Sequence, residues 1–445
     1  MAVAAEDHRP IRLVVRDDTL ERSRLTVFFR LLLVIPHLVW LVLWGIAAYV
    51  VAFVLWLAIL INREAPENLH GFVAGYLRYA THVGAYILLA ANPYPTFRGA
   101  PGYPVDLEID PPVQQSRWTG FFRLLLAIPA LLLAAALVGG LTIGSPRGSW
   151  DETGGDEYAY YGAMSIGGVA TAAAFLAWFA ILARGRAPRG LRDLIAFALG
   201  YTAQAVGYLV LLTPRYPSSD PVHMDPRPEL PEQPVRLEVA DELERSRLTV
   251  LFRLLLAIPH LVWILLWSIL VPFAAFAAWI VALVTAQVPS ALHRFLAAYV
   301  RYATHLGAYV YLVGRKFPGF TGREGSYGID VAIAASQRQS RWKTAFRLVL
   351  AFPAFVVAGA LGGVLLVVAF FTWWFALVTG RMPEGLRNLG ASCLRYSAQT
   401  LAYLLLLTDR YPYASPVLEG REPIAEPLAT PAPGPFAGPT PGDAF

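Results

Sequence analysis

The sequence predicts an all-α membrane protein with about eight transmembrane helices in four hairpin repeats. Each hairpin is followed by an amphipathic interfacial helix, and a small cytoplasmic β layer completes the fold. Hydrophobic residues make up 56% of the 445 residues and charged residues only 15%, with a mean hydropathy of +0.50. Because a soluble protein of this length needs far more surface charge, most of the chain must face lipid. The second observation is a motif that occurs four times.

Each copy of this motif is a basic and aromatic segment that leads into an apolar run, with a proline six residues after its last arginine. The copies lie at 22–40, 116–129, 245–263 and 340–353. The odd repeats resemble each other more closely than they resemble the even ones, because 20–86 aligns with 243–309 without a gap. The chain is therefore a duplicated unit of two repeats, with the break near residue 223. Two halves of the same orientation predict a pseudo-two-fold axis along the membrane normal.

The repeats set the predicted domain boundaries. In order, the chain has a disordered N-terminus at 1–10, repeat one at 11–97, repeat two at 105–217, a linker at 218–234, repeat three at 235–320, repeat four at 329–412 and a disordered tail at 413–445. The tail is rich in proline, alanine and glycine, and has too little apolar content to fold.

A short run of alternating apolar and polar residues precedes each motif and predicts a β-strand. These runs lie at 11–16, 105–110, 235–239 and 329–333. A strand of this length is not stable alone. Two interpretations therefore stay open: the four strands meet in one small sheet at one membrane face, or they are separate extended linkers.

The apolar runs predict the helical hairpins. Residues 25–61 are apolar apart from Arg30 and His37, and are too long for one crossing, which takes about 20 residues. Two short spans with a tight turn near Gly45 fit better. In repeat two a polar insert, 145–157, separates two apolar runs, so it marks a hairpin tip in water. Repeats three and four read as the same hairpin.

A third helix follows each hairpin and begins at a Pro-x-x-Leu sequence, since proline suits the first turn of a helix. These helices cover 66–90, 188–212, 289–313 and 383–407. Arginine or histidine lies near the middle of three of them, and one arginine at the centre of a span costs about 2.5–3.5 kcal/mol. We expect them to lie at the interface or to pack back on the hairpins. Twelve spans is the weaker alternative.

Charge placement predicts the topology. Arginines flank both ends of the hairpins, whereas the insert holds four carboxylates against Arg147. By the positive-inside rule the hairpin ends and both termini are cytoplasmic and the tips external. The first residues are acidic and polar, and the first apolar run is too long for a signal peptide, so no cleavable leader is expected.

The motifs in combination resemble a bacterial membrane family known as domain of unknown function 4389. They are Ser-Arg-Leu-Thr, the Phe-Arg-Leu-Leu-Leu-x-Ile-Pro-His segment, the Pro-x-x-Leu helix with Leu-Arg-Tyr, and a terminal Thr-Asp-Arg-Tyr-Pro. The resemblance covers four tandem copies, although Ala130 and Ala354 replace the histidine in repeats two and four. It implies the bacterial cytoplasmic membrane as the location, and transfers no activity, cofactor or catalytic residue.

Eight arginines at the start of the apolar runs are candidate contacts for the headgroups of anionic lipids. They are Arg24, Arg30, Arg117, Arg123, Arg247, Arg253, Arg341 and Arg347. The alternative is that they only snorkel to the cytoplasmic interface.

A second set of candidate residues forms a polar stripe that faces headgroups or another helix, or lines a transport pathway. It comprises His37, His260, Tyr79, His82, Tyr302 and His305. On the third helix Tyr79 and His82 share a face, because they are three residues apart. No metal site or cofactor is predicted, because a metal needs more ligands and no carboxylate is nearby in sequence.

These observations favour a non-catalytic membrane scaffold, or a protein that binds lipids, a membrane-protein partner or another copy of itself. The alternative is a transporter or channel with a pathway along the pseudo-two-fold axis, although no Asp or Glu lies in a predicted span. An enzyme acting on lipid comes third, because no catalytic motif stands out. No nucleic acid partner is expected.

Overall fold

The computed structural model describes residues 8–16, 19–139, 141–143, 164–166 and 168–418. The polar insert at 145–157 and most of both predicted disordered ends lie outside the described residues. The predicted tail is partly ordered, however. Ala414, Val417 and Leu418 are buried, and the carbonyl of Leu418 accepts a hydrogen bond from Arg227 at 3.0 Å.

Long apolar helices replace the predicted hairpins in repeats one, three and four. These are α3 (Ile35–Asn62), α10 (Arg253–Thr285) and α13 (Arg347–Thr379), each continuous through its midpoint. The turn expected near Gly45 is absent, because one glycine in a helix costs only about 1 kcal/mol, while a turn would break several backbone hydrogen bonds in apolar surroundings. Among the described residues, three helices are long and apolar enough to cross a membrane: Arg30–Asn62, α10 and α13.

Repeat two is interrupted at the midpoint of its long helix. The helix α6 (Arg123–Val138) and the helix α7 (Val169–Arg184) have 16 residues each. Between them β3 (Leu141–Ile143) pairs with β4 (Met164–Ile166). The break predicted for all four repeats therefore exists only where a polar insert is present.

A short helix precedes every long helix. These are α1 (Arg24–Phe28), α5 (Arg117–Phe121), α9 (Arg247–Leu251) and α12 (Arg341–Ala345), and in repeat one α2 (Arg30–Leu33) follows α1. In the first copy the helix breaks at Phe29, whose φ of −91° and ψ of 8° leave the helical region. The break places the arginine that follows it at the start of the long helix.

The third helices pack back on the long helices, which selects one of the two predicted arrangements. They are α4 (Glu67–Ile87), α8 (Arg189–Leu209), α11 (Ser290–Val310) and α14 (Glu384–Leu404), each against the long helix of its own repeat. All four end in the same way, at a leucine with a positive φ between 61° and 66°. These leucines are Leu89, Leu211, Leu312 and Leu406.

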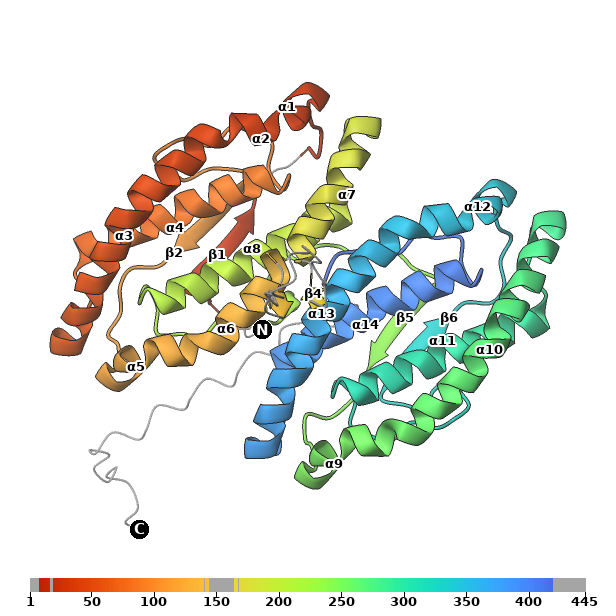
Figure 1. The fold of residues 1–445 in the computed structure, drawn as a ribbon. Coiled ribbons are helices and arrows are strands. Elements are labelled where there is room, and N and C mark those ends of the chain that lie inside the picture. The colour runs from red at the N-terminus through yellow and green to blue at the C-terminus, as the bar shows by residue number, and fades with distance from the viewer. Residues whose placement is uncertain (1–7, 17–18, 140, 144–163, 167, 419–445) are drawn as a thin grey trace, which may run out of the picture.

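The four predicted strands form two sheets, one in each half. Strand β1 (Ile11–Val15) pairs antiparallel with β2 (Val105–Ile109), and β5 (Val235–Val239) with β6 (Ile329–Ile333). The first sheet covers α4 and α8, and the second covers α11 and α14. Each half therefore has three layers: long helices, third helices and a two-stranded sheet (Figure 1).

The two halves meet through repeats two and four. Helix α13 packs against α6 and α7, whereas α3 and α10 lie at opposite edges of the molecule (Figure 1). In the most apolar 18-residue segment of α13, 50% of the segment is buried. The corresponding share is 11% in Arg30–Asn62 of repeat one and 17% in α10. The even repeats thus supply the centre of the core and the odd repeats its edges.

Neighbouring long helices in one half run antiparallel. In the first half α1 packs against α7 and α5 against α3, and in the second half α9 packs against α13 and α12 against α10. The start of each long helix therefore lies beside the end of its neighbour. This differs from the predicted parallel stacking, in which the basic starts of all repeats lie at one level.

Candidate functional site

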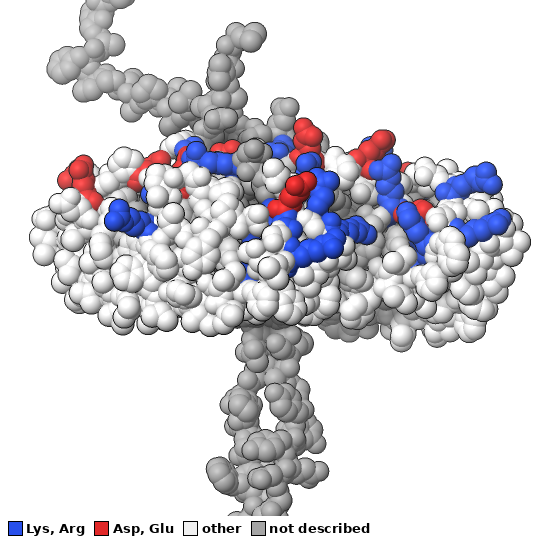
Figure 2. All heavy atoms as spheres, turned by 90° about the horizontal axis from the view of Figure 1, so that it is seen from above, with Lys and Arg blue, Asp and Glu red and all other residues white. Residues whose placement is uncertain are grey.

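The long helices together present an apolar face. Each buries one stripe against its third helix, and the other side carries large exposed hydrophobic residues. At the middle of α3 these include Leu43, Ile46, Tyr49, Val50 and Phe53. Figure 2 shows charged residues gathered along one side and the rim of a flattened molecule, while the described residues on the opposite side are uncharged in this view. A contiguous apolar surface of this extent marks an interaction surface rather than a water-facing one.

The sheet layer carries charges directly above the middle of the third helices. Arg12 Nη2 lies 3.1 Å from Glu108 Oε2 across the first sheet, and Arg78 Nε donates to the carbonyl of Leu107 at 2.8 Å. Tyr76 lies on the same helix, within one turn of Arg78. Its side chain contacts the middle of α3 at Gly45. The charged sheet is therefore level with the midpoint of the long helix, on the opposite side of the molecule.

Four buried arginines, one per repeat, join the start of each long helix to the end of its third helix. Arg30, Arg123, Arg253 and Arg347 are only 2–3% exposed. Arg347 Nη1 donates to the carbonyls of Tyr403 and Thr408, both at 2.7 Å, and Arg30 Nη1 donates to those of Tyr86 and Ala91 at 2.8 and 3.1 Å. The last carbonyls of a helix lack partners and carry the negative end of its dipole, so a guanidinium suits them.

Each of these guanidinium groups also covers a tyrosine ring. The distances to the ring centroids are 4.2 Å for Tyr86, 4.1 Å for Tyr208, 4.2 Å for Tyr309 and 4.5 Å for Tyr403. This cation–π contact is worth more once desolvated. With their donors directed at carbonyls and their faces on rings, these arginines are not open to a phosphate. The contacts of these four arginines therefore give the headgroup prediction no support.

The outer four arginines connect neighbouring repeats. Arg24, Arg117, Arg247 and Arg341 donate to the carbonyls of Ala183, Ile61, Val378 and Val284, respectively. Each of these carbonyls lies in the last turn of the neighbouring long helix. All four arginines remain exposed, so their contact with headgroups stays a prediction.

The fourfold pattern agrees with a known family. Segments 24–98, 163–219, 247–321 and 341–415 match the family described as "Domain of unknown function (DUF4389)", and together they cover more than half of the chain. The chain belongs to the DUF4389 family. No curated protein and no solved structure matches it. The second match starts only at residue 163, because the insert splits that copy and leaves α5 and α6 outside the match.

The odd DUF4389 copies each bury a histidine against a tyrosine. His37 Nδ1 lies 2.6 Å from Tyr79 Oη and its ring stacks on Phe97, with centroids 4.3 Å apart; His260 and Tyr302 repeat the pair at 2.7 Å. The structure thus brings together two predicted residues in each odd copy. The two pairs lie in repeats at opposite edges of the molecule, so they do not meet at the axis (Figure 1).

The other two predicted histidines each bond to a buried aspartate. His82 Nε2 lies 2.8 Å from Asp106 Oδ1, and His305 Nε2 lies 2.7 Å from Asp330 Oδ1. Asp106 also accepts from the backbone of Gly102 at 2.7 Å and of Leu107 at 2.9 Å. Burial raises the pKa of Asp106, but the hydrogen bonds from His82 and the backbone outweigh it, so its pKa lies below the ordinary value. These pairs fix the sheet to α4 and α11.

Glutamine takes the place of this histidine in the even copies. Gln204 Oε1 accepts from Ser218 N at 2.9 Å, and Gln399 Oε1 accepts from Tyr413 N at 3.1 Å. The same helix position therefore holds a sheet in the odd copies and the closing segment in the even copies, and Gln399 Nε2 also donates to the carbonyl of Val235 in β5 at 3.0 Å. A role in structure explains the stripe without a pathway.

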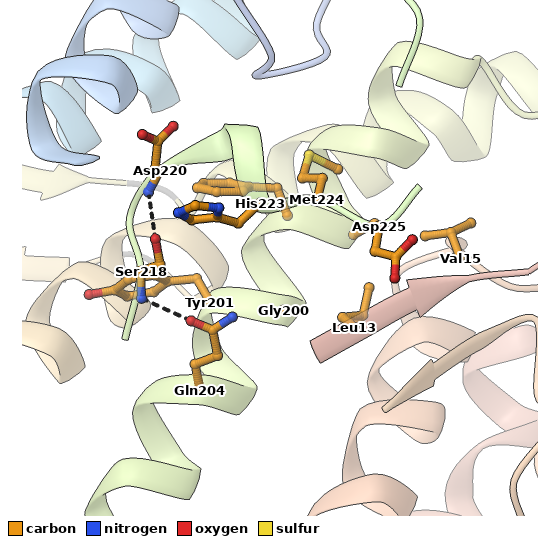
Figure 3. A pocket seen from close by; sticks show the side chains of 12 residues that line it. Leu13, Val15, Gly200, Tyr201, Gln204, Ser218, Asp220, His223, Met224 and Asp225 are labelled. Atoms are coloured by element: carbon orange, nitrogen blue, oxygen red, sulfur yellow. Dashed lines mark hydrogen bonds between the residues drawn. The ribbon is translucent and has the colours of Figure 1, made fainter. Parts of the chain in front are cut away.

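A small hollow lies where the linker crosses α8 (Figure 3). Gln204, Ser218 and His223 line it, and Asp220 N donates to Ser218 Oγ at 3.3 Å. Its volume is about 30 Å³, the share of one water molecule in the liquid. Asp220 also accepts from Asn388 on α14 at 2.5 Å, so this region joins the two halves. The pKa of Asp220 is raised above its ordinary value, mainly by burial.

Among the residues that the structure describes, no three His, Cys, Asp or Glu side chains group as metal ligands. Asp106 and Asp330 were not predicted as partners of the histidines, because they lie 24 and 25 residues away from them, in the strand of the next copy. One signal was present: an aspartate at the second position of a buried strand, in Val-Asp-Leu-Glu-Ile and Ile-Asp-Val-Ala-Ile.

Proposed function

We propose that this DUF4389 protein is a non-catalytic membrane scaffold that lies flat in one leaflet. The apolar face of the long helices lies among the acyl chains, and the sheet layer lies in water. One observation carries this proposal: the charged sheet lies above the middle of the long helices, not beyond their ends.

An orientation in which the long helices cross the bilayer is disfavoured by this geometry. A helix of 33 residues is about 50 Å long, whereas the hydrocarbon core is about 30 Å thick. Crossing would place Arg12 and Glu108, which are level with the helix midpoint, near the bilayer centre. Each such charge costs about 2.5–3.5 kcal/mol at that depth. Lying flat keeps both in water.

The antiparallel order of neighbouring helices also favours the flat orientation. If α3 crossed the bilayer, its neighbour in repeat two would cross in the opposite direction. The basic starts at Arg24 and Arg117 would then lie on opposite sides, against the positive-inside rule. In the flat orientation all basic starts lie at one depth, and the cytoplasmic leaflet of a bacterial membrane would receive them with its anionic lipids.

A transport pathway along the axis between the halves has weaker support. The hollow between Leu137 and Leu361, which lie on facing helices of the two halves, has a volume of about 10 Å³ and is lined mainly by apolar residues. Histidine pairs proposed to line a pathway are buried in separate copies. The scaffold therefore remains the better proposal.

Labelling from one side of the membrane tests the flat orientation. Cysteine is placed at Arg24 or at Glu64, which are exposed at opposite ends of the long helix of repeat one. A membrane-impermeant maleimide is added to sealed vesicles in which the protein has one orientation. We expect both positions to react to the same extent. Reaction of only one of them would show that the helix spans the bilayer. The native Cys393 is buried and serves as the unlabelled background.

A further inference from the structure

A polar hollow lies at the rim of the first half, where α1 begins and α7 ends. Glu21, Arg22, Ser23, Asn92, Arg184 and Arg186 line it, and its volume is about 490 Å³. Figure 2 shows Lys and Arg side chains spread along the rim of the molecule. Three arginines against one glutamate make the hollow positive.

The backbone holds the two outer arginines in place. Gly185 ends α7 with a φ of +71°, which favours glycine, and this residue separates Arg184 from Arg186. The amide of Arg22 donates to the carbonyl of Gly185 at 2.9 Å, and the amide of Ala187 donates to that of Leu20 at 2.8 Å. The turn carrying both arginines is therefore fixed against the start of repeat one.

Within the part of the chain that the structure describes, the guanidinium groups of these two arginines have no partner. Arg184 and Arg186 are exposed, and neither side chain makes a hydrogen bond or ion pair with another described residue. Arg22 differs, because its guanidinium donates to the carbonyls of Glu21 and Ala90 at 3.0 and 3.2 Å. The guanidinium of Arg22 is thus held in place by the backbone, and those of Arg184 and Arg186 are available to a ligand. The planar guanidinium group can bind a phosphate through two parallel hydrogen bonds.

Large apolar side chains lie on α1 and α7, the two helices that meet at the hollow. Phe28 stacks on Trp178 with ring centroids 6.3 Å apart, and Leu25 and Phe179 are largely exposed. An amphipathic ligand could therefore place an anionic group on the arginines and its chains on these residues. Aromatic residues at the level of headgroups are typical of such an interface.

We propose that this hollow binds the phosphate group of an anionic phospholipid, through Arg184 and Arg186. This inference rests on the proposed membrane association, which brings the rim to the level of the headgroups. It assigns lipid recognition to two arginines at the end of a long helix, rather than to the arginines at the start.

The second half offers a matched comparison. Thr379 stands in the place of Arg184, and Arg381, the counterpart of Arg186, lies 3.7 Å from the carboxylate of Glu244. Arg315 stands in the place of Asn92 and pairs with Glu242. This rim therefore has no pair of free guanidinium groups, and we expect it to hold no phospholipid specifically.

Native mass spectrometry of the full-length protein in neutral detergent tests the proposal. The probe lipids are phosphatidylglycerol and phosphatidylcholine at equal concentration. The variants are R184Q/R186Q, the control R381Q and the charge-keeping R184K/R186K. Glycerol phosphate is added in a separate arm, because it carries the phosphate without the acyl chains. Thermal unfolding of each variant checks that it folds.

We expect one retained phosphatidylglycerol in the wild type, with roughly tenfold weaker binding for each guanidinium removed. R381Q should bind as the wild type does, R184K/R186K should recover part of the binding, and glycerol phosphate should not compete. Equal binding in R184Q/R186Q, or an equal loss in R381Q, would overturn the proposal. Displacement by glycerol phosphate would overturn it too, because the site would then take a free phosphate. None of these results depends on whether the helices lie flat, which the labelling experiment decides separately.

Discussion

The guanidinium carbon of Arg30 lies 4.2 Å from the ring centroid of Tyr86, and the same guanidinium donates a 2.8 Å hydrogen bond to the carbonyl of that tyrosine. One side chain thus caps the third helix of its copy and packs on a tyrosine in the last turn of that helix. The other three copies repeat the ring contact, and Arg253 and Arg347 also repeat the hydrogen bond to the tyrosine carbonyl. This contact joins the layer of long helices to the layer of third helices.

Replacing one of these arginines should destabilise the protein strongly. In R30Q the carbonyls of Tyr86 and Ala91 lose a charged donor and stay buried, so we expect a loss of about 3 kcal/mol in the free energy of unfolding. The control is R24Q, at an exposed arginine that also bonds to a carbonyl, and it should lose less than about 1 kcal/mol. Denaturation in detergent, followed by tryptophan fluorescence, measures both. Equal losses would show that burial at Arg30 has no special effect.

Serine at Gly45 should stabilise repeat one. A Cβ at Gly45 would lie 2.9 Å from the hydroxyl oxygen of Tyr76, and the equivalent residues in repeat three, Ser268 and Tyr299, are already bonded at 2.8 Å. G45S should therefore gain about 1 kcal/mol from helix propensity and the new hydrogen bond. The same denaturation experiment checks this, with G45L as the overpacked comparison. A destabilised G45S would mean that Tyr76 cannot move aside.

The pair of His82 and Asp106 predicts a stability that depends on pH. Because the pKa of Asp106 is lowered in the folded state, its contribution is present above the ordinary value of 3.8 and is lost as the pH falls through the lowered pKa. We expect D106N to be less stable than the wild type by about 2 kcal/mol at pH 7, and the difference to shrink below pH 3.8. Unfolding at a series of pH values measures it. E108Q, at an exposed ion pair, should change little, and a difference for D106N that stays constant down to acid would contradict this account.

Joining α6 directly to α7 should restore the long helix of the other copies. Each has 16 residues, so one linking residue gives the 33 of α13, and the linker then falls at the position of Gly363. We expect a chain with a single alanine in place of 139–168 to fold, as judged by circular dichroism and thermal unfolding. Two further residues would rotate α7 by about 200° and point its buried face outward. That longer variant should be unstable, and equal stability of the two would contradict the equivalence of the copies.

Much of the fold could be predicted because it depends on local patterns. The strand at 235–239 alternates, and the third helices begin at a proline, so both elements lie where the sequence places them. The prediction of hairpins was wrong in repeats one, three and four, because an apolar run of this length contains no signal that distinguishes two short spans from one long helix. A flat orientation adds a third alternative that length alone does not distinguish.

The roles of single residues could be predicted less well, because they depend on contacts between distant parts of the chain. Arg30 was predicted to lie inside a helix and to contact headgroups, whereas it begins α2 and its partner Tyr86 lies 56 residues away. The αL leucine at 89 also carries no sequence signal, since glycine is the residue expected there. Repetition of the same spacing in Arg253 and Tyr309 was the one available clue.

Membrane depth at two positions tests the central claim most directly. Ile46 lies on the apolar face at the middle of α3, and Glu108 lies on the sheet side at the same level along the helix. A nitroxide attached to a cysteine at each position reports its exposure to oxygen, which concentrates in lipid, and to a water-soluble nickel complex. The flat scaffold predicts that Ile46 is exposed to oxygen and Glu108 to nickel. Equal and deep burial of both labels in lipid would contradict it.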